Sequence, residues 1–111
     1  MKRTFVAMVI ASAAVALLSI PALAGNKHVD EAIHHAKEAV DHGKQGHADA
    51  IVKHAAVALE HAQGAQKDMK NMHLDEGVKS LKDAVEHGKQ GHADVATKAA
   101  ESAVMHLSEV K

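Results

Sequence analysis

The sequence predicts an all-α fold, an antiparallel four-helix bundle made of two duplicated helical hairpins. Three observations predict it: a helical composition, a duplication with an offset of 45 residues, and apolar residues at helical spacing within each copy. The 111 residues include one Pro and a single aromatic, Phe5, whereas β-sandwiches are rich in aromatic and β-branched residues. A chain of this length allows one small domain.

The first 24 residues are predicted to be a secretory signal peptide. Two basic residues precede an apolar run over 5–20, and Ala22-Leu23-Ala24 offers a cleavage site. The alternative is an uncleaved membrane anchor, but the run is shorter than the roughly 20 residues that a spanning helix needs. We therefore expect 1–24 to be removed on export and 25–111 to form the domain.

Two segments of the domain, 28–62 and 73–107, are copies of one unit with roughly half of their positions identical. The sequence His-Gly-Lys-Gln-Gly-His-Ala-Asp occurs at 42–49 and again at 87–94. Within the first unit, two sets of apolar residues follow the helical period: Val29, Ala32, Ile33, Ala36, Ala39 and Val40, then Ala48, Ile51, Val52, Ala55, Ala58 and Leu59. Each unit is therefore predicted to be an αα-hairpin.

The ends of these helices are marked by capping residues. Asn26 and Asn71 stand where N-caps are expected, and Gly43 with Gly46, like Gly88 with Gly91, is predicted to end one helix and open a tight turn. Residues 63–70 would join the hairpins. One hairpin of this length cannot bury its apolar stripe, so two hairpins packed into a bundle are favoured.

Several function classes are excluded by what the sequence lacks. With no cysteine, an exported chain has neither disulfides nor thiolate metal sites, so a metal ligand must be imidazole, carboxylate or thioether. The formal charge is −1, and loss of Lys2 and Arg3 would make it −3. Without a basic patch or stacking aromatics, nucleic-acid binding has no support.

Histidine is concentrated at one position of the heptad. With Val29, Ala48, Leu74 and Ala93 at position a of the four helices, ten of the eleven histidines fall at position g and only His34, at f, lies outside the row. A tolerated surface residue would be scattered over several positions. The g row consists of His28, His35, His42, His47, His54, His61, His73, His87, His92 and His106.

These histidines are predicted to face one another, because g residues face g residues in antiparallel helices. Within hairpins this pairs His42 with His47, His35 with His54, His28 with His61, His87 with His92, and His73 with His106. Each facing pair of histidines is one rung of a ladder along its hairpin. The second hairpin lacks the middle rung, because Ser80 would stand opposite Ala99. Rungs would lie about 10 Å apart. The opposite bundle handedness would instead pair g residues between hairpins; the within-hairpin ladder is favoured.

Carboxylates lie within reach of this ladder. Glu31 precedes His35 by four residues, and Glu38 lies four residues from both His34 and His42, so these side chains share a helix face. For Glu31 and Glu38 two roles are left open: they bind a metal or support a histidine that does, or they pair with lysines on a solvated face. Lysine pairing is predicted for Glu60, Glu86, Glu101 and Glu109. Residues 69–73 combine two thioethers with an imidazole, which suits Cu(I), although linker methionines more often pack against helix ends.

The heptad His-Ala-Lys-Glu-Ala-Val-Asp at 35–41, the doubled His-Gly-Lys-Gln-Gly-His turn and the signal peptide resemble the periplasmic small metal-binding protein family. The resemblance implies a monomeric helical bundle in the periplasm that takes up several divalent ions, copper especially, for sequestration or tolerance. It implies the g-row histidines as ligands. Ser80 and Ala99 depart from the pattern, and 107–111 lacks histidine, so we expect fewer metals on the second hairpin.

The sequence thus predicts a protein that buffers Cu(II), with Zn(II) or Ni(II) as other candidate ions. The alternative is a pH-responsive periplasmic helical protein or chaperone in which the histidines sense protons. An enzyme is the least favoured class, because one side chain repeated along open flanks does not form a sheltered site of unlike groups.

Overall fold

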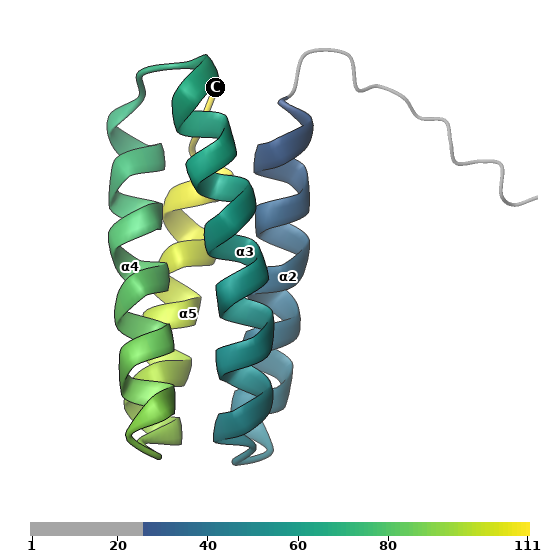
Figure 1. Cartoon of the computed structure of the whole chain (residues 1–111), viewed down its shortest axis with the longest axis vertical. Helices are drawn as coiled ribbons and strands as arrows, with labels where there is room; N and C mark the ends of the chain where they lie inside the picture. The colour runs from purple at the N-terminus through teal and green to yellow at the C-terminus, as the bar shows by residue number, and fades with distance from the viewer. Residues whose placement is uncertain (1–25) are drawn as a thin grey trace, which may run out of the picture.

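The computed structural model describes residues 26–111, which form four α-helices (Figure 1). The helices are α2 (Lys27–Lys44), α3 (Ala48–Asp68), α4 (Met72–Lys89) and α5 (Ala93–Ser108). The predicted signal peptide, 1–24, lies outside the described residues. Among those residues, no helix has the length and apolar character needed to cross a membrane.

The helices run up and down in turn, and each packs against two neighbours. The pairs α2–α3, α4–α5, α3–α4 and α2–α5 form the four sides of the bundle. The two His-Gly-Lys-Gln-Gly-His turns lie at one end, and the α3–α4 connection and the C-terminus lie at the other (Figure 1). The predicted all-α antiparallel four-helix bundle is confirmed.

Asparagine caps start the first helix of each hairpin, as predicted. The Asn26 side chain accepts hydrogen bonds from the backbone N–H groups of His28 and Val29, at 2.8 and 3.3 Å. Asn71 does the same for His73 and Leu74, at 2.9 and 3.1 Å. These bonds satisfy N–H groups that have no partner inside the helix. The caps thereby fix where the first histidine of each row stands.

Each hairpin turn is a Schellman motif that ties two histidines together through the backbone. The His47 N–H donates to the His42 carbonyl at 3.1 Å, and the His92 N–H to the His87 carbonyl at 2.9 Å. The residue that reverses the chain, Gly46 or Gly91, has a φ of 82° or 80°, a conformation that glycine adopts without steric cost. The last histidine of one helix is thus held beside the first of the next.

Gly43 and Gly88 do not end the helices, contrary to the prediction. Both lie buried inside the last turn of α2 and α4. A Cβ on Gly43 would clash with Thr97 and lie 3.1 Å from Ile51 Cδ1, and one on Gly88 would lie 2.8 Å from Val52 Cγ2. These glycines are therefore needed for close helix packing, and the turn conformation falls to Gly46 and Gly91.

Replacing Gly43 with Ala is expected to destabilise the bundle, although Ala normally stabilises a helix relative to Gly by about 1 kcal/mol. The added methyl would overpack the Thr97 and Ile51 side chains, which costs about 1–3 kcal/mol. Urea unfolding would measure this. In the control Gly64→Ala, the added Cβ meets the His28 ring at 3.4 Å, an ordinary contact, and stability should stay or rise. Equal gains in both variants would contradict the packing role.

The core is narrow because most of its residues are alanine. Four side chains, Ile51, Leu74, Leu81 and Leu107, supply its fully buried bulk. The predicted apolar stripe is buried at Val29, Ala32, Ala36, Ala39, Val40, Ile51, Ala55 and Ala58. Small side chains bring helix axes close together, which places residues at the core flanks of neighbouring helices within reach of one another.

The predicted linker over 63–70 is mostly helical. Helix α3 continues to Asp68 because Ala62 and Ala65 extend its buried stripe, so only residues 69–71 connect the hairpins. Met69 packs partly buried against the core, whereas Met72 and Met105 are exposed. Of the two interpretations of 69–73, the partial burial of Met69 favours packing against the helix ends.

Candidate metal centre

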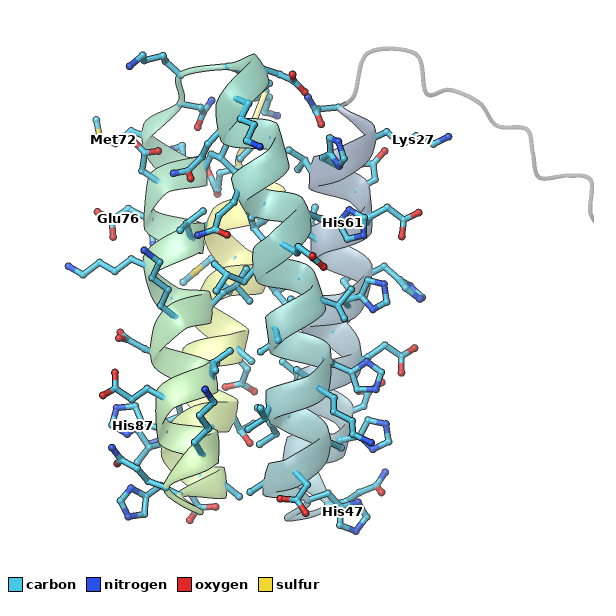
Figure 2. The ribbon with its side chains drawn as sticks, in the orientation of Figure 1. Lys27, His47, His61, Met72, Glu76 and His87 are labelled. Atoms are coloured by element: carbon cyan, nitrogen blue, oxygen red, sulfur yellow. The ribbon has the colours of Figure 1, made fainter. Side chains whose placement is uncertain are left out.

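The histidines of each hairpin face one another along the seam between its two helices. In the first hairpin the ring centroids of His28 and His61 are 5.6 Å apart, those of His35 and His54 are 6.1 Å apart, and those of His42 and His47 are 6.3 Å apart. The predicted pairing within hairpins is confirmed. His61 and His47 lie on the α2–α3 side of the bundle, and His87 lies on the α4–α5 side (Figure 2).

The rings of the first hairpin form one continuous column instead of three separate rungs. His35 also stacks on His61, with centroids 5.9 Å apart, and His42 stacks on His54 at 5.1 Å. Helical side chains lean toward the N-terminus of their own helix, and in antiparallel helices they lean in opposite directions. This lean brings each ring toward the neighbouring rung, so successive rings along the column lie 5.1–6.3 Å apart.

Two groups of three side chains in this column can each hold a metal ion. Glu31, His35 and His61 form the upper group, and Glu38, His42 and His54 form the lower group. In each, the candidate ligand atoms lie within 4.8 Å of one another. Each group takes one Glu and one His from α2, four residues apart, and a second His from α3.

The carboxylates of these groups approach imidazole nitrogens instead of lysines. Glu31 Oε1 lies 3.9 Å from His35 Nε2, and Glu38 Oε2 lies 3.9 Å from His34 Nε2. Glu38, a member of the lower group, therefore also lies beside exposed His34, whose ring meets the His35 ring edge-on at 5.3 Å. Of the two open readings for Glu31 and Glu38, this placement favours a role beside the histidines.

Of the glutamates predicted to pair with lysines, one does so and another contacts a histidine. Glu101 lies 4.0 Å from Lys44 Nζ, as the lysine pairing predicts. Glu109 does not follow that prediction, since its Oε1 lies 4.0 Å from His73 Nε2. Sequence reasoning missed this contact, although Glu109 follows His106 by three residues and thus lies near it along the same face of the chain.

Two rings in the groups have one nitrogen turned inward. Nδ1 of His35 and Nδ1 of His42 are buried and have no hydrogen-bond partner among the described residues. A buried N–H without a partner costs about 1–3 kcal/mol, so the neutral ring favours its proton on the other nitrogen. In His35 that other nitrogen, Nε2, faces Glu31, so an ion that binds there must displace its proton to the buried Nδ1.

Burial lowers the pKa of His54 below its ordinary value. The second cause is the positive charge that His42 would carry, and His35 and His34 act in the same direction, while Glu38 opposes them. The ring of His54 therefore remains neutral to lower pH than a free imidazole. A neutral ring is the form that binds a metal.

The second hairpin keeps the end rungs and loses the groups between them. His73 and His106 have centroids 6.1 Å apart, and His87 and His92 have centroids 6.2 Å apart. Ser80, at the position equivalent to His35, instead shares a 3.1 Å hydrogen bond with the Ser102 hydroxyl. No group of three ligands within 4.8 Å occurs among the described residues of this hairpin.

The donor set of the first hairpin suits divalent transition metals. Two neutral imidazoles with one carboxylate supply N, N and O ligands to ions such as Cu(II), Ni(II) and Zn(II), with room for water or a further ring. A family model described as Small metal-binding protein matches residues 2–110. The comparison with curated proteins gives no match.

Proposed function

Because the chain belongs to the small metal-binding protein family, we propose that it buffers divalent transition metals in the periplasm and prefers copper. The observation that carries this proposal is the pair of Glu-His-His groups, Glu31 with His35 and His61, and Glu38 with His42 and His54. The predicted export of the chain supports the location.

Capture and release follow from the chemistry of the groups. Each draws ligands from both α2 and α3, so an ion bound there would cross-link the hairpin. Four of the six rings in the column are half-buried, and the carboxylates stand at the surface or near it. Ions and protons can therefore exchange with solvent, which suits reversible buffering.

Copper is preferred because imidazole and carboxylate sites bind first-row divalent ions in the order that places Cu(II) above Ni(II) and Zn(II). The groups are assembled from helix surfaces and hold no rigid cage that would reverse this order. Both groups consist of imidazole and carboxylate ligands, which suit Cu(II).

Native mass spectrometry with Cu(II), Zn(II) and Ni(II) at pH 7.5 tests the proposal. We expect at least two discrete tightly bound copper ions, with Cu(II) displacing Zn(II). The double variant His35→Ala, His54→Ala should lose two ions, because the two rings belong to different groups. In the control Lys53→Ala, next to His54, the count should stay the same. Binding no stronger than that of a scrambled chain would overturn the proposal.

A gain of binding is expected when the missing ring of the second hairpin is restored. Ala99 occupies the position equivalent to His54, and Asp83 and His87 are equivalent to Glu38 and His42. Ala99→His should therefore add one ion to the count in native mass spectra. Lys98→His supplies the same side chain one residue away on an exposed position and should add none. An equal count in both variants would contradict the three-ligand geometry.

A further inference from the structure

The two hairpins meet through the same contact made twice. Gly43 of α2 lies against Thr97 of α5, and Gly88 of α4 lies against Val52 of α3. The offset of 45 residues interconverts the two contacts, because it relates the two glycines to each other and Val52 to Thr97. A face that meets an equivalent face in both directions is the pattern of an isologous interface, which joins two identical molecules around a two-fold axis. Each hairpin therefore carries a face that a second copy of the chain is able to cover.

The seams between the hairpins are apolar, whereas the seams within hairpins carry the histidines. Because the g rows face each other within hairpins, the e rows face each other between them. Four of the e residues, one from each helix, pack partly buried against the core: Ile33, Leu59, Val85 and Val104. Apolar attraction has no direction and depends on the area removed from water. The same packing is restored whichever copy of the chain supplies the second hairpin.

Polar contacts across these seams lie at the surface of the described bundle. Lys44 Nζ lies 4.0 Å from Glu101 Oε2, and both side chains are exposed. Gln66 Nε2 donates to Asp75 Oδ1 at 2.9 Å, again between exposed side chains. Exposed contacts of this kind add little to stability, so they do not hold the two hairpins of one chain together against an exchange.

The hinge between the hairpins is residues 69–71, at the end of the bundle opposite the Gly-rich turns (Figure 1). It contains neither glycine nor proline, and Met69 and Lys70 are good helix formers. Asn71 caps α4 through its side chain, so it is the main local signal that separates α4 from α3. If the hinge becomes helical, α3 and α4 form one continuous helix, and the two hairpins of that chain can no longer pack on each other.

We propose that two copies of the chain exchange hairpins, so that 26–68 of one copy packs on 72–108 of the other. The product is a dimer of two bundles with the core of the monomer. Both metal groups stay intact, because their ligands all come from α2 and α3. The dimer gives up the packing of Met69 against the core and gains a continuous helix through each hinge. High protein concentration favours it, and it forms only when the bundle opens.

Sedimentation velocity after refolding from urea, at protein concentrations from about 10 μM to about 1 mM, tests the exchange. We expect a dimer fraction that rises with concentration. Asn71→Ala removes a cap that only the reversed hinge needs. One cap changes a helix equilibrium about fivefold and each dimer opens two hinges, so the association constant should rise about thirtyfold. Asn26→Ala, the control, removes the equivalent cap of α2 and should leave the association constant unchanged.

Cross-linking distinguishes exchange from contact between outer surfaces. The chain has no cysteine, and Val40 and Val104 line one groove between α2 and α5. A chain with Val40→Cys, refolded together with a chain carrying Val104→Cys, should therefore form a disulfide between chains on oxidation. The same two chains mixed after separate refolding are the control and should remain unlinked, because exchange requires the bundle to open.

A protein that stays monomeric over this range of concentrations would overturn the proposal. A dimer whose single-cysteine chains do not cross-link would overturn it as well, because its copies would then touch only through outer surfaces. An equal rise in association for Asn26→Ala and Asn71→Ala would contradict the opening of the hinge. None of these results bears on the proposed metal binding, which is measured by the count of bound ions.

Discussion

Saturating copper is expected to raise the melting temperature of the protein by about 15 °C or more. An ion that binds only the folded state stabilises it by about 4 kcal/mol per site at a thousand times the dissociation constant. For a domain of this size each kcal/mol corresponds to about 4–8 °C. The effect should be large because ligands from α2 and α3 meet only in the folded hairpin. Thermal unfolding followed by circular dichroism measures it.

The double variant Glu31→Gln, Glu38→Gln should lose most of this gain, since one carboxylate is removed from each group. Glu60→Gln with Glu86→Gln changes the same number of charges outside the groups and should retain the gain. If copper binds but leaves the melting temperature of the unmodified protein unchanged, the ions are not held between the helices.

Acidification from pH 7.5 to 5 is expected to weaken metal binding about a thousandfold. Each group uses two imidazoles that must be neutral, and at pH 5 only about 3% of imidazoles with an ordinary pKa are neutral. Because both imidazoles of a group must be neutral, the two losses multiply. The loss is smaller in the lower group, where the pKa of His54 is lowered. Isothermal titration with Zn(II) across this range measures it, and a change of less than tenfold would mean that carboxylates dominate the binding.

The lower group should keep its ion to lower pH than the upper group. The lowered pKa of His54 means that protons compete less for this ring. The same shift makes folding pH-dependent without metal. The unfolded chain takes up its proton near pH 6.5 while the folded chain resists it, so the stability contributed by His54 is present above that pH and is lost as pH falls through the lowered pKa. His54→Gln should flatten this part of the stability profile measured by urea unfolding.

Much of the fold could be predicted because its signals are local. The apolar period set the buried stripe, the asparagines set the helix starts, and the offset of 45 residues set the two hairpins. The roles of Gly43 and Gly88 could not be predicted, because they depend on contacts with α5 and α3 that are distant in the sequence. The last residues of α3 could not be predicted for a related reason: the burial of Ala62 and Ala65 depends on the other helices.

The heptad row predicted which histidines meet, but not how the groups form. Whether the histidines pair within hairpins or between them depends on bundle handedness, which the heptad pattern leaves open. The grouping of His35 with His61, and of His42 with His54, arises from the opposite lean of side chains in antiparallel helices. The contact between Glu109 and His73 could not be predicted, because it crosses from α5 to α4 and follows no helical spacing.

Anomalous diffraction at the copper edge, from crystals of the protein loaded with Cu(II), would locate the bound ions. We expect one strong peak among Glu31, His35 and His61 and a second among Glu38, His42 and His54. Strong copper peaks only at other surfaces, with these two groups empty, would contradict this expectation.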